Sequence, residues 1–277
     1  MSTPVPARAL PSRKLVASIL CLVAVVAATY LLLVLLEVDP NSFFFDLRFL
    51  SDIAHQMLPP SFELLWTRKS ILFSLLETLS MAFFATMVGG AIALVLGFLA
   101  ASNTTPHPLF RLLVRTLLAS QRSLPHLLLI LVLLVAVGIG PFAGAMALTF
   151  GTVGTFGKFF ADAIEHAEKG VIESVASVGG TRVQTIRFAI VPQVMPAFIG
   201  NLFYAFDHNL RLAIPLGVFG GGGIGFELEF ARGLLHFHDV ILYTMLIVIM
   251  ITIMERISDW VRRIVLGSSA LTSKRLA

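Results

Sequence analysis

The chain has few charged residues and one cysteine. Only 13% of its 277 residues are Asp, Glu, Lys or Arg, whereas 57% are hydrophobic. A typical soluble domain has about 25% charged residues, so this composition excludes an ordinary soluble protein. The single cysteine, Cys21, can form no disulfide within the chain. The sequence therefore predicts a membrane protein without an internal disulfide.

Runs without charged residues locate the membrane-spanning segments. A crossing helix needs about 20 residues, because the hydrocarbon core is about 30 Å thick. The run at 123–157 is too long for one crossing, and Pro141 divides it because proline cannot donate a helical hydrogen bond. The sequence predicts an all-α polytopic fold with about six spans, at 15–36, 78–101, 122–138, 142–162, 188–206 and 240–260.

The basic residues indicate the orientation. If the N-terminus is cytoplasmic, most of the 20 Lys and Arg residues lie at cytoplasmic ends of the spans. The positive-inside rule therefore predicts that both termini are cytoplasmic. The first span is longer than the apolar part of a signal peptide and lacks a cleavage site after it, so we expect it to remain. The pI near 9.6 follows from this topology, and we expect no nucleic-acid partner.

Three regions are expected along the chain. Residues 1–70 comprise a cytoplasmic tail, the first span and an external segment in which the aromatics at 43–45 and Trp66 mix with charges. Such a mixture is typical of short helices in the lipid headgroup layer, although a surface for an external partner is an alternative. Residues 71–265 form the main transmembrane domain, and 266–277 form a cytoplasmic tail.

A polar segment at 164–192 separates two apolar runs. Glu173, Ala176 and Gly179 lie in its first part, where a helix over 163–178 is expected to end, because a helix C-terminal cap favours a residue that tolerates positive φ. A second helix follows, and Pro192 marks the start of the fifth span. A compact pair of helices of this kind is suited to docking a partner. An ordinary loop with chance glycines and prolines is the alternative.

Asp207, His208 and Arg211 lie together near the expected external end of the fifth span. An arginine at membrane depth is costly, which makes it a candidate functional residue. Its planar group of donors also suits an oxyanion. Asp207 and Arg211 are four residues apart and could pair instead. Two roles are open: contact with a passing anion in a substrate path, or a brace for a gate.

A glycine-rich stretch follows, with Gly220, Gly221, Gly222, Gly223 and Gly225. Its spacing is that of a dinucleotide-binding loop, but no strand precedes it, so this function is excluded. We expect either a flexible external hinge or a close-packed re-entrant turn beside a gate. Residues 152–159 lack the end residues of a phosphate-binding loop, and we expect no cofactor or metal in this chain. Gly151, Gly154 and Gly157 predict a tight helix–helix contact.

Several motifs in order resemble one family of transport proteins. They are Glu77-Thr78-Leu79, Val137-Gly138-Ile139-Gly140-Pro141, Pro192-Gln193-Val194-Met195-Pro196, Asn209-Leu210-Arg211 and the glycine-rich stretch. Over about 75–265, the chain is similar to the permease subunits of ABC importers for phosphonates and phosphite. Glu173, Gly179 and Pro192 match the EAA loop of such subunits, although Ser174 and Val175 replace its two alanines.

The resemblance implies a MetI-like ABC permease fold in a bacterial inner membrane. It also implies partners: a second permease copy, two ATPase subunits that bind ATP and Mg, a periplasmic substrate-binding protein and membrane lipid. Contacts with the ATPase are then expected at Glu173, Ala176, Gly179 and Pro192. The alternative is a secondary transporter or channel for a small anion. A membrane enzyme would need converging catalytic groups, which the sequence lacks, so we expect a transport subunit.

Overall fold

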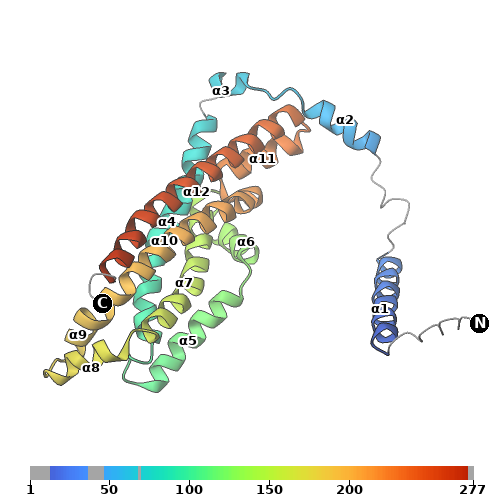
Figure 1. Ribbon diagram of the computed structural model, residues 1–277. Helices are drawn as coiled ribbons and strands as arrows, with labels where there is room; N and C mark the ends of the chain where they lie inside the picture. Colours follow the sequence, from blue (N-terminus) through green and yellow to red (C-terminus); the bar gives the residue numbers. More distant parts are fainter. Residues whose placement is uncertain (1–12, 37–46, 68–69, 274–277) are drawn as a thin grey trace, which may run out of the picture. The chain divides into compact units, whose positions relative to one another are not determined.

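A computed structural model describes residues 13–36, 47–67 and 70–273, which form helices without strands (Figure 1). The first helices are α1 (Arg13–Leu35), α2 (Leu47–Met57), α3 (Glu63–Thr67), α4 (Ser70–Ala100), α5 (Pro108–Ser123), α6 (His126–Val137) and α7 (Pro141–Glu165). They are followed by α8 (Lys169–Ser177), α9 (Arg182–Thr185), the π-helical turn η1 (Ile186–Ile190), α10 (Val191–Leu216), the π-helical turn η2 (Gly217–Gly221), α11 (Gly223–Gly233) and α12 (Phe237–Ser273).

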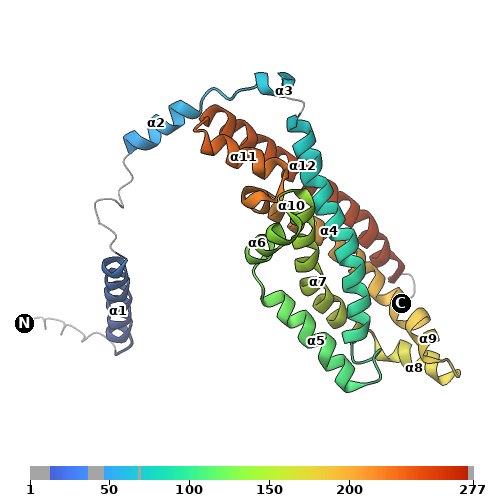
Figure 2. The ribbon, with the colours of Figure 1, turned by 180° about the vertical axis from the view of Figure 1, so that it is seen from behind.

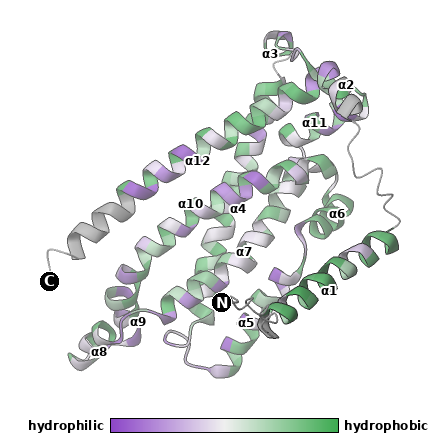
Figure 3. Ribbon diagram, turned by 45° about the vertical axis from the view of Figure 1, so that its right-hand side comes forward, coloured by the Kyte–Doolittle hydropathy of each residue, from purple (hydrophilic) through white to green (hydrophobic). Residues whose placement is uncertain are grey.

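The chain divides into two units, at 1–56 and 57–277. In the first unit, α1 is hydrophobic along its length (Figure 3). Nearly all of its described side chains are exposed. The helix α2 is amphipathic. Together with α3, it confirms the short helices expected between the first two spans, and their location at the headgroup layer stays a prediction. The aromatics at 43–45 lie outside the described residues, as do 1–12 and 274–277 of the two expected tails.

Among the described residues, four helices are long and apolar enough to cross a membrane, or five if α5 and α6 form one span bent by 91°. The 25 residues of α7 extend about 37 Å at 1.5 Å each, which is also enough. This helix lies inside the second unit against α4, α5, α6 and α10, so it does not need an apolar surface all round. With α7 included, the helices agree with about six spans.

The spans expected at 122–138 and 188–206 differ most in extent from the prediction. The span expected at 122–138 is α6, whose 12 residues reach about 18 Å and cannot cross alone. The span expected at 188–206 lies within a longer helical run, which begins at Arg182, continues through η1 and α10, and kinks at Gly220 in η2. The charged residues do not end this helix, because Asp207 and Arg211 pair along it at a spacing that helices favour.

In the second unit, α4 packs along α7, and α10 lies beside both (Figures 1 and 2). Small residues allow this approach. A Cβ atom on Gly97 would lie 2.8 Å from the Cβ atom of Phe160, and one on Gly157 would lie 2.6 Å from the Leu118 side chain of α5. The tight helix–helix contact predicted from the glycines of α7 is therefore confirmed.

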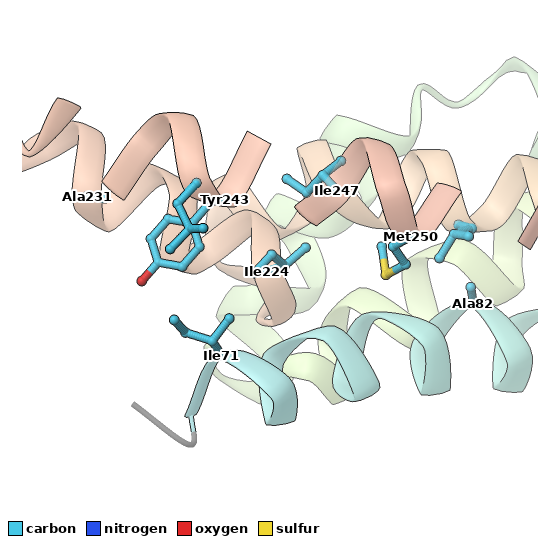
Figure 4. Packing of buried hydrophobic residues seen from close by; sticks show 9 residues of the cluster. Ile71, Ala82, Ile224, Ala231, Tyr243, Ile247 and Met250 are labelled. Carbon is cyan, nitrogen blue, oxygen red and sulfur yellow. The ribbon is translucent and has the colours of Figure 1, made fainter. Parts of the chain in front are cut away.

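One apolar cluster joins α4, α11 and α12 (Figure 4). Ile71 and Ala82 of α4 are buried together with Ile224 of α11. Ile247 and Met250 of α12 complete this part of the cluster. Because α11 directly follows the glycine-rich turn, the burial of these apolar side chains holds the turn close to α4.

Candidate functional site

The α8–α9 segment, residues 168–185, is a pair of short helices at one end of the second unit (Figure 1). On α8, Glu173 and Ala176 are exposed. The Glu173 carboxylate forms no hydrogen bond or ion pair with the residues that the structure describes. Val178 and Val183 are 84% and 73% exposed. The segment therefore presents an unpaired carboxylate and two apolar side chains to its surroundings.

The turn between the two helices is defined by its backbone. Gly179 has a φ of +82°, which confirms the expected glycine cap at the end of α8. A capping box then starts α9. The Thr181 hydroxyl accepts a hydrogen bond from the Gln184 amide at 3.4 Å, and the Gln184 side chain accepts one from the Thr181 amide at 2.7 Å. These caps define where α8 ends and where α9 begins.

The apolar side of the α8–α9 segment packs on the ends of α4, α7 and α10. Ile172 and Ile186 are partly buried against a cluster that includes Ile190. The helix predicted over 163–178 is in fact two helices, because α7 continues to Glu165 and α8 begins only at Lys169. The segment is thus attached to three membrane helices by its apolar side and is exposed on the other.

Glu165 is the last residue of α7, beyond its apolar turns. It connects the ends of α4, α5 and α7 that lie near the α8–α9 segment. Its carboxylate accepts a hydrogen bond from the Ser102 amide at 2.6 Å and pairs with Arg115 of α5. The Nε atom of Arg115 donates to the Ala100 carbonyl at 2.8 Å. Burial raises the pKa of the Glu165 carboxyl, but the Ser102 and Arg115 donors outweigh it and hold this pKa below its ordinary value.

Pro192 lies directly after the π-helical turn η1, inside the helical run that begins at Arg182. A proline there cannot donate a helical hydrogen bond, and a local π-helical adjustment is one way in which membrane helices accommodate it. The preceding turn, η1, is π-helical, a conformation that often occurs at functional sites. No loop separates α9 from α10, because both belong to this helical run. The structure therefore joins the α8–α9 segment directly to a membrane helix. The roles predicted for Glu173, Ala176, Gly179 and Pro192 at a partner stay predictions.

One face of α10 is polar. Asn201, Tyr204, His208 and Arg211 follow one another three or four residues apart, which places them on one side of a helix. None of the four is buried, and the rings of Tyr204 and His208 stack with their centroids 6.2 Å apart. We call these four residues the polar stripe. A polar face along an apolar helix indicates contact with water or with another chain.

Asn209 shows how deep the polar stripe lies. This residue is 1% exposed, and its amide donates hydrogen bonds to the hydroxyls of Thr86 at 3.0 Å and Thr152 at 2.9 Å. Thr86 lies midway along α4, and Thr152 lies midway along α7. The neighbouring Arg211 is therefore at mid-depth. Asp207, His208 and Arg211 therefore lie deeper than the external end at which they were expected, because Asn209 beside them contacts the middles of α4 and α7.

Arg211 pairs with two carboxylates. Its guanidinium lies 3.2 Å from Asp207, as the spacing allowed, and 3.4 Å from Glu255 on α12. The side chains of Arg211 and Glu255 are 49% and 51% exposed. Charges at this depth are costly in hydrocarbon, by several kcal/mol each. This face of α10 and α12 therefore lies against water or another chain rather than against lipid.

The glycine-rich turn is close-packed. Gly220 and Gly222 have φ values of +98° and +78°. A Cβ atom on Gly221 would lie 2.7 Å from the Leu216 carbonyl oxygen, and one on Gly222 would lie 2.9 Å from the Pro141 nitrogen. Of the two structural expectations for this stretch, the structure shows the close-packed turn. A role for its glycines beside a gate stays a prediction.

Two residues of α4 cap the N-terminus of α11. The Glu77 carboxylate accepts a hydrogen bond from the Gly223 amide at 2.7 Å, and the Thr78 hydroxyl accepts one from the Ile224 amide at 2.9 Å. A cavity of about 210 Å³ beside them is lined by Glu77, Glu227 and the glycine-rich turn. The sequence assigned no role to Glu77 and Thr78, because their partners lie 146 residues away.

Gln193, Asn209 and Glu255 are also sites to which the sequence assigned no role. The available signal for Asn209 was its place in the short polar group at 207–211, between two apolar runs. Gln193 contacts the start of α8, and Glu255 contacts α10 from another helix, so neither contact follows from local spacing.

The second unit is thus a bundle of membrane-crossing helices with a polar stripe at mid-depth and an exposed helix pair at one end. Its fold is similar to that of a chain from the MetNI methionine ABC transporter in an inward-facing conformation. The TM-score is 0.63 and the identity 21%, over 74% of this chain and 99% of that chain.

The sequence comparison identifies the family. Residues 93–266 match the binding-protein-dependent transport system inner membrane components, and the chain belongs to this family. It is 34% identical, over 81% of each chain, to the phosphite transport system permease protein PtxC of Stutzerimonas stutzeri. It is also 34% identical to the phosphate-import permease protein PhnE of Mycolicibacterium smegmatis, over 93% of this chain and 48% of that protein, so it spans about half of the latter's length. The chain is an ABC importer permease subunit, and the MetI-like fold is confirmed.

Proposed function

We propose that this permease subunit moves phosphonate, or a related phosphorus oxyanion such as phosphite or hypophosphite, by ATP-driven alternating access. A second permease copy, or a related chain, completes the path. Two ATPase subunits bind ATP and Mg, and a periplasmic binding protein delivers the anion. Both termini are cytoplasmic. The observation that supports ATP coupling best is the exposed α8–α9 segment, which continues directly into α10.

The α8–α9 segment is the proposed docking site for the ATPase. Glu173 offers a carboxylate without a partner among the described residues, and Ala176 lies on the same exposed side of α8. Val178 and Val183 add apolar surface that a cleft of a partner would bury. Gly179 supplies the turn that brings the two helices together. Pro192 lies in the first turn of α10, the membrane helix that would receive the movement of the ATPase.

The polar stripe is the proposed wall of the substrate path. It lies at mid-depth on a face where exposed charges exclude contact with lipid. Because α9, η1 and α10 form one helical run, displacement of α9 displaces the stripe as well. The glycine-rich turn at the other end of α10 is the proposed gate.

The proposed substrate class rests on Arg211 and on relatives. A guanidinium presents a planar group of donors that matches a phosphorus oxyanion. His208 and Asp207 lie beside Arg211, and Asp207 pairs with it. The relatives are described as permeases for phosphite and phosphate, so the chemical class is shared among them although the anion differs.

A secondary transporter or channel for a small anion is the second candidate. The observation in its favour is the ion-pair cluster of Asp207, Arg211 and Glu255 within membrane helices, because secondary transporters often use ionisable groups there. Uptake in that case would proceed without ATP. The family membership favours the importer.

The test is ATP hydrolysis and uptake by the permease reconstituted with its cognate ATPase and binding protein. Phosphonate, phosphite, hypophosphite and phosphate are supplied in turn. Glu173→Ala and Gly179→Asp are expected to leave the permease in the membrane but to release the ATPase or uncouple hydrolysis from uptake. Ser120→Ala, an exposed position on α5, is the matched control.

Each outcome has a distinct meaning. Stimulation by one of the four anions, dependent on the permease, supports the importer and identifies its cargo. If the complex assembles but none of them stimulates hydrolysis, the proposed substrate class is wrong. If both variants retain the ATPase and transport normally, the docking assignment is wrong. If uptake continues without ATP, the second candidate is correct.

A further inference from the structure

Gln193 connects two helices through both ends of its side-chain amide. Its Oε1 atom accepts a hydrogen bond from the backbone N–H of Glu168 at 2.8 Å, and its Nε2 atom donates to the carbonyl of Ala189 at 2.8 Å. The amide orientation follows from chemistry, because a backbone N–H can only donate and a carbonyl can only accept. Gln193 therefore bridges the start of α8 and the turn η1.

This bridge occurs where α8 has few other attachments. Glu168 is the N-cap residue of α8, and no side chain within the helix caps that end. No residue of α8 is fully buried. Besides its short covalent links to α7 and α9, α8 is held to the bundle by the Gln193 bridge and by partly buried apolar contacts such as that of Ile172. Apolar contacts are non-directional and permit sliding, whereas a hydrogen bond fixes both distance and direction.

The far end of the bridge lies at the start of the helix that bears the polar stripe. Ala189 belongs to η1, and Gln193 belongs to the first turn of α10. Arg211 lies 18 residues beyond Gln193, which is about 27 Å along a helix. No loop interrupts the helix between them, although Pro196 lies inside it, and we expect displacement at its start to be transmitted along its length.

We propose that Gln193 is the positioning residue that transmits movement of α8 to α10. The inference rests on the proposed function, in which an ATPase moves the α8–α9 segment. Without the bridge, α8 slides on its apolar base, and ATP hydrolysis proceeds without an equal movement of the polar stripe. The expected defect is in coupling, while assembly is retained.

The experiment compares Gln193→Met with wild type in the full importer, reconstituted in liposomes with its cognate ATPase and binding protein. Methionine keeps the length of the side chain and removes both hydrogen-bonding groups. Gln121→Met on α5 makes the same chemical change away from the α8–α9 segment. The measurements are retention of the ATPase, rate of hydrolysis, and anion transported per ATP hydrolysed.

In Gln193→Met, we expect the ATPase to be retained and hydrolysis to stay within about twofold of wild type. Transport per ATP is expected to fall roughly tenfold, the effect of losing one or two hydrogen bonds of average strength. Gln121→Met is expected to keep the wild-type ratio. Gln193→Glu, which keeps the acceptor for the Glu168 amide and loses the donor to Ala189, is expected to give an intermediate ratio.

An unchanged ratio in Gln193→Met overturns the proposal. So does an equal fall in hydrolysis and transport together with loss of the ATPase, which would assign Gln193 to folding or assembly. Failure of the proposed function is separately visible, because the wild-type permease would then not retain the ATPase at all.

Discussion

Glu77→Ala tests whether α4 holds the glycine-rich turn through the N-terminus of α11. The substitution removes the acceptor of the Gly223 amide and leaves the bond from the Ile224 amide to Thr78 in place. Gly223 is buried, so its amide has little access to water as a replacement. We therefore expect Glu77→Ala to destabilise the packing of α11 on α4.

The magnitude follows from the single amide that loses its partner. A buried donor without a partner costs about 1 to 3 kcal/mol, and loss of a helix N-cap costs about 1 kcal/mol. Glu77 is half-buried and solvent can reach part of the site, so we expect about 1 to 2 kcal/mol. Glu77→Gln keeps an acceptor oxygen and loses only the charge at the helix terminus, which is worth about 0.3 to 1 kcal/mol.

Thermal unfolding of the purified permease in detergent measures both variants. At about 2 to 4 °C per kcal/mol for a chain of this size, Glu77→Ala should lower the midpoint by about 2 to 8 °C. Glu77→Gln should lower it by about half as much or less. Glu173→Ala, an exposed carboxylate, is the control and should leave the midpoint unchanged. A midpoint for Glu77→Ala equal to that of wild type would refute the cap as a stabilising contact.

Three further predictions follow from other contacts. Asn209→Leu should lower the free energy of unfolding by only about 1 kcal/mol, because each interhelical hydrogen bond in a membrane is worth about 0.6 kcal/mol. The hydroxyls of Thr86 and Thr152 also keep their backbone acceptors. A loss above about 3 kcal/mol would contradict this estimate. The pKa of the Glu165 carboxyl is lower in the folded chain than its ordinary value of 4.5. The ionised carboxylate therefore stabilises the folded chain above pH 4.5, and this contribution is lost as the pH falls through the pKa of the folded chain. Glu165→Gln should therefore reduce stability by about 0.5 kcal/mol at pH 7 and make acid unfolding less steep, and unchanged acid unfolding would contradict the assignment. Arg211→Ala should lower anion uptake roughly tenfold. Glu255→Gln should lower uptake less, because Asp207 still holds the Arg211 guanidinium. An equal loss of uptake in the two variants would indicate that Arg211 only braces α10 against α12.

Local features were predicted well. The break before Pro141 and the glycine cap at Gly179 are both present, because proline and glycine restrict or permit backbone angles at their own positions. The extent of the fifth span was not predicted, since a search for charge-free runs stops at Asp207. The helical run in fact continues past Asp207 and Arg211, which pair with each other, as far as the kink at Gly220. The short α6 was missed for a related reason, because an apolar run does not show where the chain bends by 91°.

The sequence by itself determined that this is a helical membrane protein, and its ordered motifs indicated the permease family. Both conclusions depend on residues that are near one another in the chain. The mid-depth position of Arg211, the cap that Glu77 provides for α11 and the bridge from Gln193 to Glu168 were decided only by the tertiary structure. Each depends on how far one helix lies along another, and the packing of small residues between helices sets that distance.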